Sequence, residues 1–259
     1  MTYNIASGGI DNNGSRIEHI IKIINDENPD FLAIQEAVNF EKNDFALLRR
    51  ISSETNLPYF EFSEGQVYED GNRYHVASLS KTPVKDLNTF PDTPFTHAGL
   101  VTTIDSPVGE LTLCNIHLHS SSEDERLKGV DAILEYLSKF EKSIILGDHN
   151  ALSRTDQYDD ITTDEFTHYD LHRFEVTDLF NENFVDTACF LHKDDMRTHP
   201  TVGMGHPITK TPVRIDYIFV TEPLVSNLKD TTVIKTETAD IASDHYPVTL
   251  TLVRSSKLQ

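Results

Sequence analysis

The chain contains short apolar segments that end on a carboxylate, and patterns typical of helices separate these segments. Glu36 stands just after the segment Phe31–Ile34, and Asp148 stands just after Ser143–Leu146. Apolar runs of this length, bounded by polar residues, fit strands that are buried on both faces. Because a carboxylate beside such a strand is costly unless it is paired or metal-bound, the acids themselves mark a candidate site. The pattern predicts two sheets covered by helices.

Helices are expected where apolar residues recur at helical spacing. The first opens at a capping box, Ser15 to Glu18, and stops at Asn28-Pro29-Asp30. The other expected helices are Phe45–Glu54, a helix from the capping box Ser122–Glu125 to about Phe140, and a short one near Asp178–Asn183 within the otherwise loop-like residues 151–212. Strands are expected at Met1–Asn4, Phe31–Ile34, Tyr59–Phe62, Tyr74–Leu79, Leu100–Ile104, Leu111–Leu118, Ser143–Leu146, Val213–Val220, Thr231–Thr236 and Thr249–Val253, with turns at Asp70-Gly71 and Pro107–Gly109.

The length and composition favour one domain. The 259 residues have a hydrophobic share of 38%, and no linker or internal repeat divides them, so we expect a single domain over residues 1–259. The two cysteines, Cys114 and Cys189, form no C-x-x-C pair, which disfavours a zinc site built on thiolates. The apolar surroundings of Cys114 predict a core residue, and a disulfide between the two cysteines stays open.

The charge balance bears on partners and location. A formal net charge of −20 argues against a surface rich in phosphate-binding lysines. The acidic surface favours solubility, and a few of the acids are enough to hold a cation. No apolar run approaches membrane-spanning length, and no signal peptide precedes the first strand. We expect a cytoplasmic monomer without stable membrane insertion, or a secreted protein if a leader peptide has been removed.

Four acids, Glu36, Asp148, Asp216 and Asp244, each follow or interrupt an apolar stretch. Any one alone is explained as a turn cap, whereas the four together, with histidines beside them, favour a site. Glu36 at the mouth of a buried strand suits a hard cation such as magnesium, which prefers oxygen ligands. A solvated strand end is the alternative. Asn4 is a polar residue in the first strand and could orient a metal-bound group.

Two further pairs of polar residues alternate along expected strands. Asp148 and Asn150 flank His149, and residues two apart in an extended segment face the same way. One would accept a proton and the other would donate to a phosphoryl oxygen, although an Asx turn is the common alternative. His117 and His119 also alternate. We favour His117, which lies deeper in the strand, as a donor to a phosphoryl group, against a buried histidine satisfied by backbone.

The adjacent residues Asp244 and His245 precede the last expected strand. Asp244 can hold a divalent cation, and His245 can exchange a proton near neutral pH. Asp216 lies inside a strongly apolar strand and needs a partner. We expect that partner to be His245, because a carboxylate fixes the imidazole tautomer and stabilises its charged form. An ion pair between Asp216 and Arg214 is the alternative.

Six motifs, taken in order, resemble those of the endonuclease/exonuclease/phosphatase superfamily. They are Thr-Tyr-Asn-Ile at 2–5, Leu-Ala-Ile-Gln-Glu at 32–36, Asn-Ile-His-Leu at 115–118, Gly-Asp-His-Asn at 147–150, Arg-Ile-Asp-Tyr-Ile-Phe at 214–219 and Ser-Asp-His-Tyr-Pro-Val at 243–248. The resemblance implies an α/β (α+β) fold, a four-layer α/β/β/α sandwich with two packed mixed β-sheets flanked by helices. It also implies deoxyribonuclease-like hydrolysis of a phosphoester with Mg²⁺ or Mn²⁺.

Carried over position by position, the resemblance implies two groups of site residues. Those on the metal side are Glu36 as the principal ligand, Asn4 as its support, and Asp244. Those of the catalytic group are Asp148 for the attacking water, Asn150 and His117 against the phosphate, and Asp216 paired with His245 as general acid/base or transition-state stabiliser. His149 departs from the usual apolar residue of its motif and is expected to add a polar contact near the site.

The predicted activity is that of a phosphodiesterase or nuclease acting on DNA, RNA or a nucleotide. The alternatives are a small-molecule phosphatase, a non-catalytic binding module, and a lipid-headgroup phosphodiesterase of the sphingomyelinase kind. The last needs an apolar hairpin for membrane contact, and Thr89–Pro91 with Pro94-Phe95 is the nearest candidate. Loops at 62–75, 86–98 and 153–212 are expected to shape the pocket, with Arg73, Arg173 and Arg197 as candidate phosphate contacts or solvated loop residues.

Overall fold

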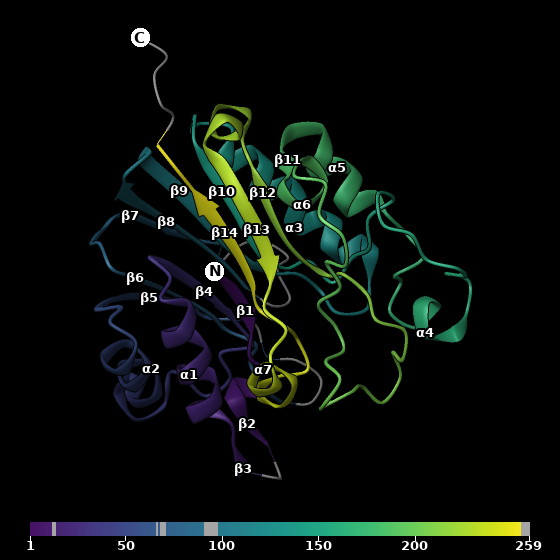
Figure 1. Cartoon of the computed structure of the whole chain (residues 1–259), viewed down its shortest axis with the longest axis horizontal. Coiled ribbons are helices and arrows are strands. Elements are labelled where there is room, and N and C mark those ends of the chain that lie inside the picture. Colours follow the sequence, from purple (N-terminus) through teal and green to yellow (C-terminus); the bar gives the residue numbers. More distant parts are fainter. Residues whose placement is uncertain (12–13, 66, 68–70, 91–97, 255–259) are drawn as a thin grey trace.

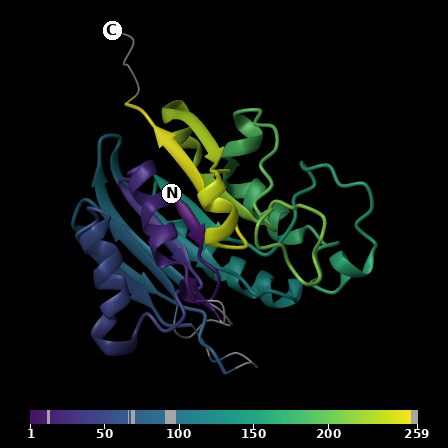
Figure 2. The ribbon, with the colours of Figure 1, turned by 60° about the horizontal axis from the view of Figure 1, so that its bottom comes forward.

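Two six-stranded β-sheets pack face to face, and helices cover their outer faces (Figures 1 and 2). The computed structural model describes residues 1–11, 14–65, 67, 71–90 and 98–254. The four-layer α/β/β/α sandwich expected from the sequence is confirmed. Of the sequence-based turns, Asp70 lies outside the described residues, as do Pro91, Pro94 and Phe95 of the apolar hairpin.

The first sheet has the strand order β13-β14-β1-β4-β6-β5, and β1 and β4 run parallel. Helices α1 (Ile17–Glu27) and α2 (Lys42–Glu54) cover its outer face, and α7 (Glu237–Ala242) lies beside α1 (Figure 1). The strands are β1 (Thr2–Asn4), β4 (Phe31–Gln35), β5 (Tyr59–Ser63), β6 (Val76–Ser80), β13 (Leu228–Val233) and β14 (Val248–Leu252). A short hairpin, β2 (Ile10–Asp11) and β3 (Gly14–Ser15), precedes α1.

The second sheet has the order β11-β12-β10-β9-β8-β7. Helices α3 (Glu123–Leu137) and α5 (Glu175–Asn183) cover its outer face (Figure 2). The strands are β7 (Val84–Thr89), β8 (Ala98–Ser106), β9 (Gly109–His117), β10 (Ser143–Asp148), β11 (Val185–Asp186) and β12 (Asp216–Val220). As expected, β8 and β9 form a hairpin, while β9 and β10 run parallel with α3 as their connection.

Side-chain alternation along the strands of the second sheet separates two hydrophobic cores. In β10, Ile144 and Leu146 face the first sheet and join the core between the sheets. The intervening Ile145 belongs to the outer core with Val130 and Ile133 of α3. Because successive side chains of a strand point to opposite faces, the same alternation decides which polar residues at the strand ends face inward.

A buried polar bridge crosses from one sheet to the other within the inner core. The Nδ2 amide of Asn115 on β9 donates to the carbonyls of Ala77 at 2.9 Å and Ile34 at 3.2 Å. Its Oδ1 accepts from Nε2 of Gln35 on β4 at 2.7 Å. Since a buried amide left without partners is costly, these bonds favour one relative position of the two sheets.

The capping box expected at Ser15 and Glu18 is wrong. Ser15 lies in β3, where it pairs with Ile10, and the helix begins at Ile17 with Arg16 in the preceding position. Arg16 makes no capping side-chain hydrogen bond, and Oγ of Ser15 accepts from the Ile17 amide, at 3.4 Å, instead of from the Glu18 amide. The backbone of Ser15 pairs with Ile10 in the hairpin, so Ser15 is not positioned as the residue that caps the helix. The second box is confirmed in its serine half, because Oγ of Ser122 accepts from the Glu125 amide of α3, while the Glu125 carboxylate pairs with Lys128.

Residues 151–212 contain more regular structure than the single helix that was expected. Besides α5, they form β11 and the short helices α4 (Asp164–Thr167) and α6 (Thr187–Phe190). Asp186 accepts from two amides at the start of α6, a local cap that the weak periodicity hides. Several boundaries also move. Among them, α3 ends at Leu137, β12 begins at Asp216, and β13 ends at Val233 because Thr236 instead caps α7.

The cysteines are both free, with Cys114 buried in the outer core as expected and Cys189 exposed. A disulfide between them, left open by the sequence, is therefore not formed. Among the helices of the described residues, none combines the length and the apolar character needed to span a bilayer.

We predict that Gly147→Ala destabilises the protein by about 2–4 kcal/mol. Gly147 has a φ of +146°, and an added Cβ would lie 2.0 Å from the Ile116 carbonyl oxygen of β9. Urea unfolding of the two proteins measures the effect. Gly71→Ala is the control, because Gly71 also has a positive φ but no described atom lies within 4 Å of its Cβ position. Equal losses in the two variants would contradict the steric account.

Candidate active site

Three polar residues lie in one row across the end of the second sheet. His117 on β9 and Asp216 on β12 are the register partners of Asp148 on β10. All three are buried, and alternation places them on the inner face, in line with Leu146 and Ile218 of the inner core. Adjacent strands of the sheet therefore deliver a histidine and two carboxylates to the same edge.

His245, three residues before β14 of the first sheet, closes on this row. Its Nδ1 lies 2.9 Å from Oδ2 of Asp216, the pair expected from the sequence. Its Nε2 lies 3.8 Å from Oδ2 of Asp148, and Nε2 of His117 lies 3.5 Å from the same oxygen. The alternative pairing of Asp216 with Arg214 is not formed, since the guanidinium binds Asp186 and Asp156 instead.

Arg214 has carboxylate partners other than Asp216. Arg214 donates to Asp186 Oδ2 at 2.8 Å and to Asp156 Oδ2 at 3.0 Å, on the side of β12 away from His245. The guanidinium also lies over the Tyr217 ring, 4.3 Å from its centroid. Residues two apart thus do not share a face here, because β12 begins only after Arg214.

Burial and mutual charge set the protonation of this network. Burial raises the pKa of Asp148 to about 7, with the negative charge of Asp216 adding to the rise and His245 opposing it. Burial alone would lower the pKa of His245, but the carboxylates of Asp216 and Asp148 raise it well above its usual range. His245 is therefore a cation held between two acids at neutral pH.

Asn4 connects the two sheets at the site. Its Nδ2 donates to Asp148 Oδ2 at 2.9 Å and to Glu36 Oε1 at 3.2 Å. The other oxygen of Glu36 accepts from the Ser7 amide at 2.7 Å. Glu36 itself has a φ of 55°, a left-handed conformation that non-glycine residues adopt at a cost. Both strand-end carboxylates are thus held in place by the same amide.

Glu36 and Asp244 face a shared space from separate segments of the first sheet. Burial raises the pKa of Glu36, and the charge of Asp244 raises it further. Two carboxylates that repel one another, with oxygen atoms open to a pocket, suit a divalent cation that accepts oxygen ligands. The residues present therefore fit the hard-cation site expected at Glu36 and Asp244.

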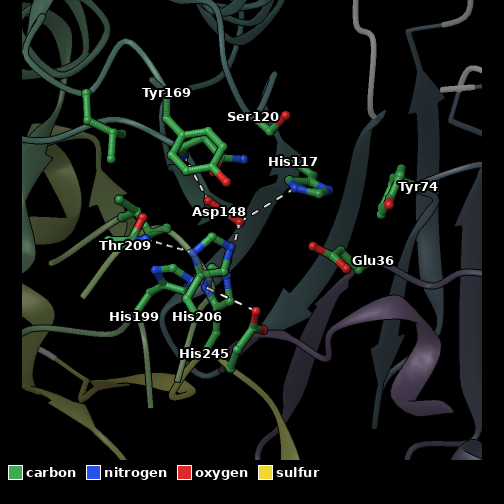
Figure 3. Close-up of a pocket in the computed structure, with 14 residues that line it drawn as sticks. Glu36, Tyr74, His117, Ser120, Asp148, Tyr169, His199, His206, Thr209 and His245 are labelled. Atoms are coloured by element: carbon green, nitrogen blue, oxygen red, sulfur yellow. Dashed lines mark hydrogen bonds and ion pairs between the residues drawn. The ribbon is translucent and has the colours of Figure 1, made fainter. Parts of the chain in front are cut away.

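A pocket opens over these groups, and Figure 3 shows its side chains converging from both sheets. Of the eight residues predicted from the sequence, all but Asn4 and Asp216 line it; those two are buried behind it. The full lining consists of Glu36, Tyr74, His117, Ser120, Asp148, Asn150, Tyr169, Leu171, His199, His206, Thr209, Ile215, Asp244 and His245.

The sequence analysis missed two histidines of this lining. The His199 ring is tilted against that of His245, with ring centroids 4.6 Å apart, and the His206 ring meets the His199 ring edge-on, with centroids 5.0 Å apart. Burial, with the charges of His245 and His206, lowers the pKa of His199 well below its usual range. Nδ1 of His206 accepts from the amides of Ile208 and Thr209. Both come from the loops expected to shape the pocket, but no motif singled them out.

His149 does not add the polar contact expected near the site. It lies on the opposite face of the β10 end from Asp148, buried among Phe180, Tyr217 and Phe219 of the outer core. Its Nδ1 lies 2.9 Å from the Gly147 carbonyl oxygen, and burial lowers its pKa to about 4. The single-residue step along the strand reverses the direction of the side chain.

Asp148 closes the Asx turn that was the alternative reading of this pair, and Asn150, two residues on, also lines the pocket. Its backbone amide donates to Asp148 Oδ1 at 2.8 Å, and its Nδ2 donates to the Leu118 carbonyl at 3.0 Å. His119, the weaker of the two strand histidines, instead accepts from the Ser121 amide at Nδ1. The two readings of Asn150 are compatible, because the turn directs the amide into the pocket.

The three loop arginines that were candidate phosphate contacts do not line the pocket. Arg73 pairs with Glu64, Arg173 with Asp124 and Glu175, and Arg197 with Asp195, each at a partly exposed position. Their reading as solvated loop residues is the better one. The lining drawn from the described residues contains neither lysine nor arginine, so its positive charge at neutral pH comes from His245, whose pKa the neighbouring carboxylates raise.

A buried arginine supports one wall of the pocket. Arg126 of α3 is fully buried, and its Nε donates to the equally buried Glu123 at 2.8 Å. Its NH1 group donates to the carbonyls of His119 and Ser120, and its NH2 group to those of Tyr169 and Asp170. A guanidinium with all five donors directed to fixed oxygens holds both segments against α3, and Ser120 and Tyr169 thereby face the site.

Residues 1–245 match the model of the Endonuclease/Exonuclease/phosphatase family. The chain belongs to this family of phosphoester hydrolases, and it is an enzyme of that class. A search of curated protein sequences found no match.

Among solved structures, the chain is similar to an AP endonuclease from Archaeoglobus fulgidus, with 19% identity, a TM-score of 0.71 and 97% of each chain covered. It is also similar to an endonuclease/exonuclease/phosphatase family protein from Leptotrichia buccalis, with 18% identity, a TM-score of 0.71, and 97% of this chain and 98% of that one covered. A third is the 3′ phosphatase NExo from Neisseria bound to product DNA hairpin, with 18% identity, a TM-score of 0.64, and coverages of 97% and 98%. At these identities the likenesses show a shared fold.

We predict that Arg126→Met lowers the free energy of unfolding by about 3–5 kcal/mol, because it leaves Glu123 buried without its charge partner. Lys128→Met on the same helix is the control, since the ion pair of Lys128 with Glu125 is solvent-exposed. Its expected effect is within about 0.5 kcal/mol. Urea unfolding measures both, and a loss below 1 kcal/mol in Arg126→Met would show that the guanidinium does not hold the wall.

Proposed function

We propose that the chain is a divalent-metal-dependent phosphodiesterase or nuclease that acts on nucleic acid or a nucleotide, working as a single domain over residues 1–259. One observation carries the proposal: His117 and Asp148 of the second sheet line the same pocket as Glu36 and Asp244. Hydrolysis of a phosphoester needs a base for water, charge neutralisation on the phosphoryl oxygens, and donors for the developing charge.

Glu36 and Asp244 would hold Mg²⁺ or Mn²⁺, and Asn4 would fix the orientation of the Glu36 carboxylate. When bound there, the cation supplies neutralisation of the phosphoryl oxygens. The hydrogen bonds from Asn4 and Ser7 leave Glu36 few rotamers, so the carboxylate is preorganised. An oxygen-only donor pair of this kind favours magnesium or manganese.

Asp148 would take the proton of the attacking water. A pKa of about 7 suits a base that works near neutral pH. Its two oxygens accept from Asn4 and from the Asn150 backbone amide, and these bonds fix the carboxylate plane. The second N–H of the Asn150 side chain would donate to a phosphoryl oxygen.

His245 and His117 would donate to the phosphoryl group. Asp216 holds the His245 ring by Nδ1, so Nε2 is the nitrogen that faces the pocket. Its raised pKa keeps this proton in place at neutral pH. Asp216 thus acts as a positioning residue, and the charged imidazole stabilises the transition state.

The substrate is the finer part of the proposal. The names of two similar structures, an AP endonuclease and a 3′ phosphatase bound to a DNA hairpin, favour DNA. One observation favours the small-molecule phosphatase instead, namely a described pocket lining without lysine or arginine. The monomeric state and the cytoplasmic location belong to the proposal as well.

We predict that His245→Ala lowers kcat by about 10³-fold or more, because charge stabilisation and proton donation are lost together. Mg²⁺- and Mn²⁺-supported hydrolysis of bis(p-nitrophenyl) phosphate, DNA, RNA and nucleotides measures it, and chelation with EDTA should abolish the wild-type rate. His119→Ala, whose ring lies outside the pocket lining, is the matched control. A fully active His245→Ala enzyme would remove this residue from the reaction, and no turnover by wild type on any substrate would refute the proposed function.

A further inference from the structure

Three ligand-bearing side chains, one of them Asp244 of the proposed magnesium pair, lie close together at the edge of the pocket. The candidate ligand atoms of His199, Asp244 and His245 all lie within 4.8 Å of one another. Nε2 of His199 is 3.9 Å from Oδ2 of Asp244. Figure 3 shows the two imidazoles beside each other below Asp148, with Glu36 across the pocket. Glu36 belongs to neither of the ligand triplets within the described residues.

The two imidazoles have the features of metal ligands. His245 is held through Nδ1 by Asp216, and metal-ligating histidines are commonly oriented by a carboxylate on the opposite ring nitrogen. His199 is 7% exposed and lines the pocket, and its Nδ1 has no hydrogen-bond partner among the described residues. The other ring nitrogen, Nε2, is the one near Asp244 and is therefore the candidate ligand atom.

The second triplet at the site, Asp148, Asp216 and His245, is less suited to a cation. Its two acids already flank the charged ring of His245, and Oδ2 of Asp216 lies at hydrogen-bond distance, 2.9 Å, from the Nδ1 atom of that ring. The charges of that group are therefore balanced within the protein. By contrast, Asp244 is partly exposed to the pocket, and His199 places a second nitrogen donor beside it.

We propose that His199, Asp244 and His245 form an inhibitory site for a transition-metal cation such as Zn²⁺, distinct from the Mg²⁺ position at Glu36. Two nitrogen donors and one oxygen donor favour zinc or cobalt over magnesium, which prefers oxygen alone. A cation there displaces the proton on Nε2 of His245 to solvent, and this is the proton that would be donated to the phosphoryl group. The cation also shares Asp244 with the magnesium pair. The inhibition rests on the proposed function, whereas the binding does not.

Two measurements test this site. The first is Zn²⁺ inhibition of Mg²⁺-supported hydrolysis, normalised to the rate of each protein without Zn²⁺. The second is the visible absorption of Co²⁺ added to the metal-free protein, which reports binding without activity. We expect His199→Ala to raise the half-inhibiting Zn²⁺ concentration and to weaken Co²⁺ binding, each by about 10-fold or more. His206→Ala is the matched control, because His206 lines the same pocket outside the triplet and its Nδ1 accepts backbone amides; it should change either value less than about 3-fold.

The outcomes separate the two proposals. Unchanged Zn²⁺ inhibition and Co²⁺ binding in His199→Ala would overturn the site while leaving hydrolysis intact, as would equal losses in His199→Ala and His206→Ala. If the wild type hydrolyses nothing with any metal, the proposed function fails, but a Co²⁺ spectrum that depends on His199 would still support the site. Wild type, His199→Ala and His206→Ala should melt at the same temperature, so that a difference between them reports the loss of a metal ligand and not unfolding.

Discussion

The hydrogen bond from Asn4 to Asp148, 2.9 Å long and buried, joins the ends of the two sheets on which the site depends. The same amide donates to Glu36, so one side chain orients the proposed metal ligand and the proposed base together. Asn4 can do this because β1 lies next to β4 in the first sheet and faces β10 of the second. The bridge through Gln35 and Asn115, deeper in the inner core, holds the same pair of sheets.

The charge balance around His245 follows from that packing. Closing the sheets buries Asp148 and Asp216, and two buried carboxylates are costly unless a cation lies between them. His245 meets that need, which is why its pKa rises although burial alone would lower it. Only Oδ2 of Asp216 contacts the His245 ring, and Oδ1 has no hydrogen-bond partner within the described residues. The carboxylate thus orients the imidazole although one of its own oxygens is left without a hydrogen bond. Stability and site chemistry therefore depend on the same proton.

Most of the strands and the polar residues at their ends could be predicted from the sequence, because alternation and apolar runs are local signals. It named His117 and Asp148 as site residues, and it paired Asp216 with His245 across 29 residues of sequence. The same rule of alternation, applied to the residue after Asp148, would have turned His149 toward the outer core. The functional roles of these residues stay predictions, since geometry brings them together without measuring what they do.

Other features depend on contacts that no short pattern encodes. His199 and His206 lie on a loop that is positioned by backbone hydrogen bonds to residues distant in sequence, such as that from the Thr201 amide to the Asp244 carbonyl. The packing of the histidine rings against one another also positions it. Arg126 reads as an ordinary polar position of a helix, although it is fully buried and holds two pocket segments. The Ser15 box failed because a hairpin competed for the same backbone. In each case a tertiary partner, absent from the local sequence, decided the outcome.

The central claim is that His245 is kept charged at the site by Asp216 and Asp148. An NMR titration of the His245 ring nitrogens in the metal-free protein, compared with Asp216→Asn, tests it most directly. The account predicts that wild-type His245 loses its proton well above the usual pH of about 6.5, and that the pKa falls markedly in Asp216→Asn. Titration of His245 at or below that pH in the wild type, with no change in the variant, would contradict it.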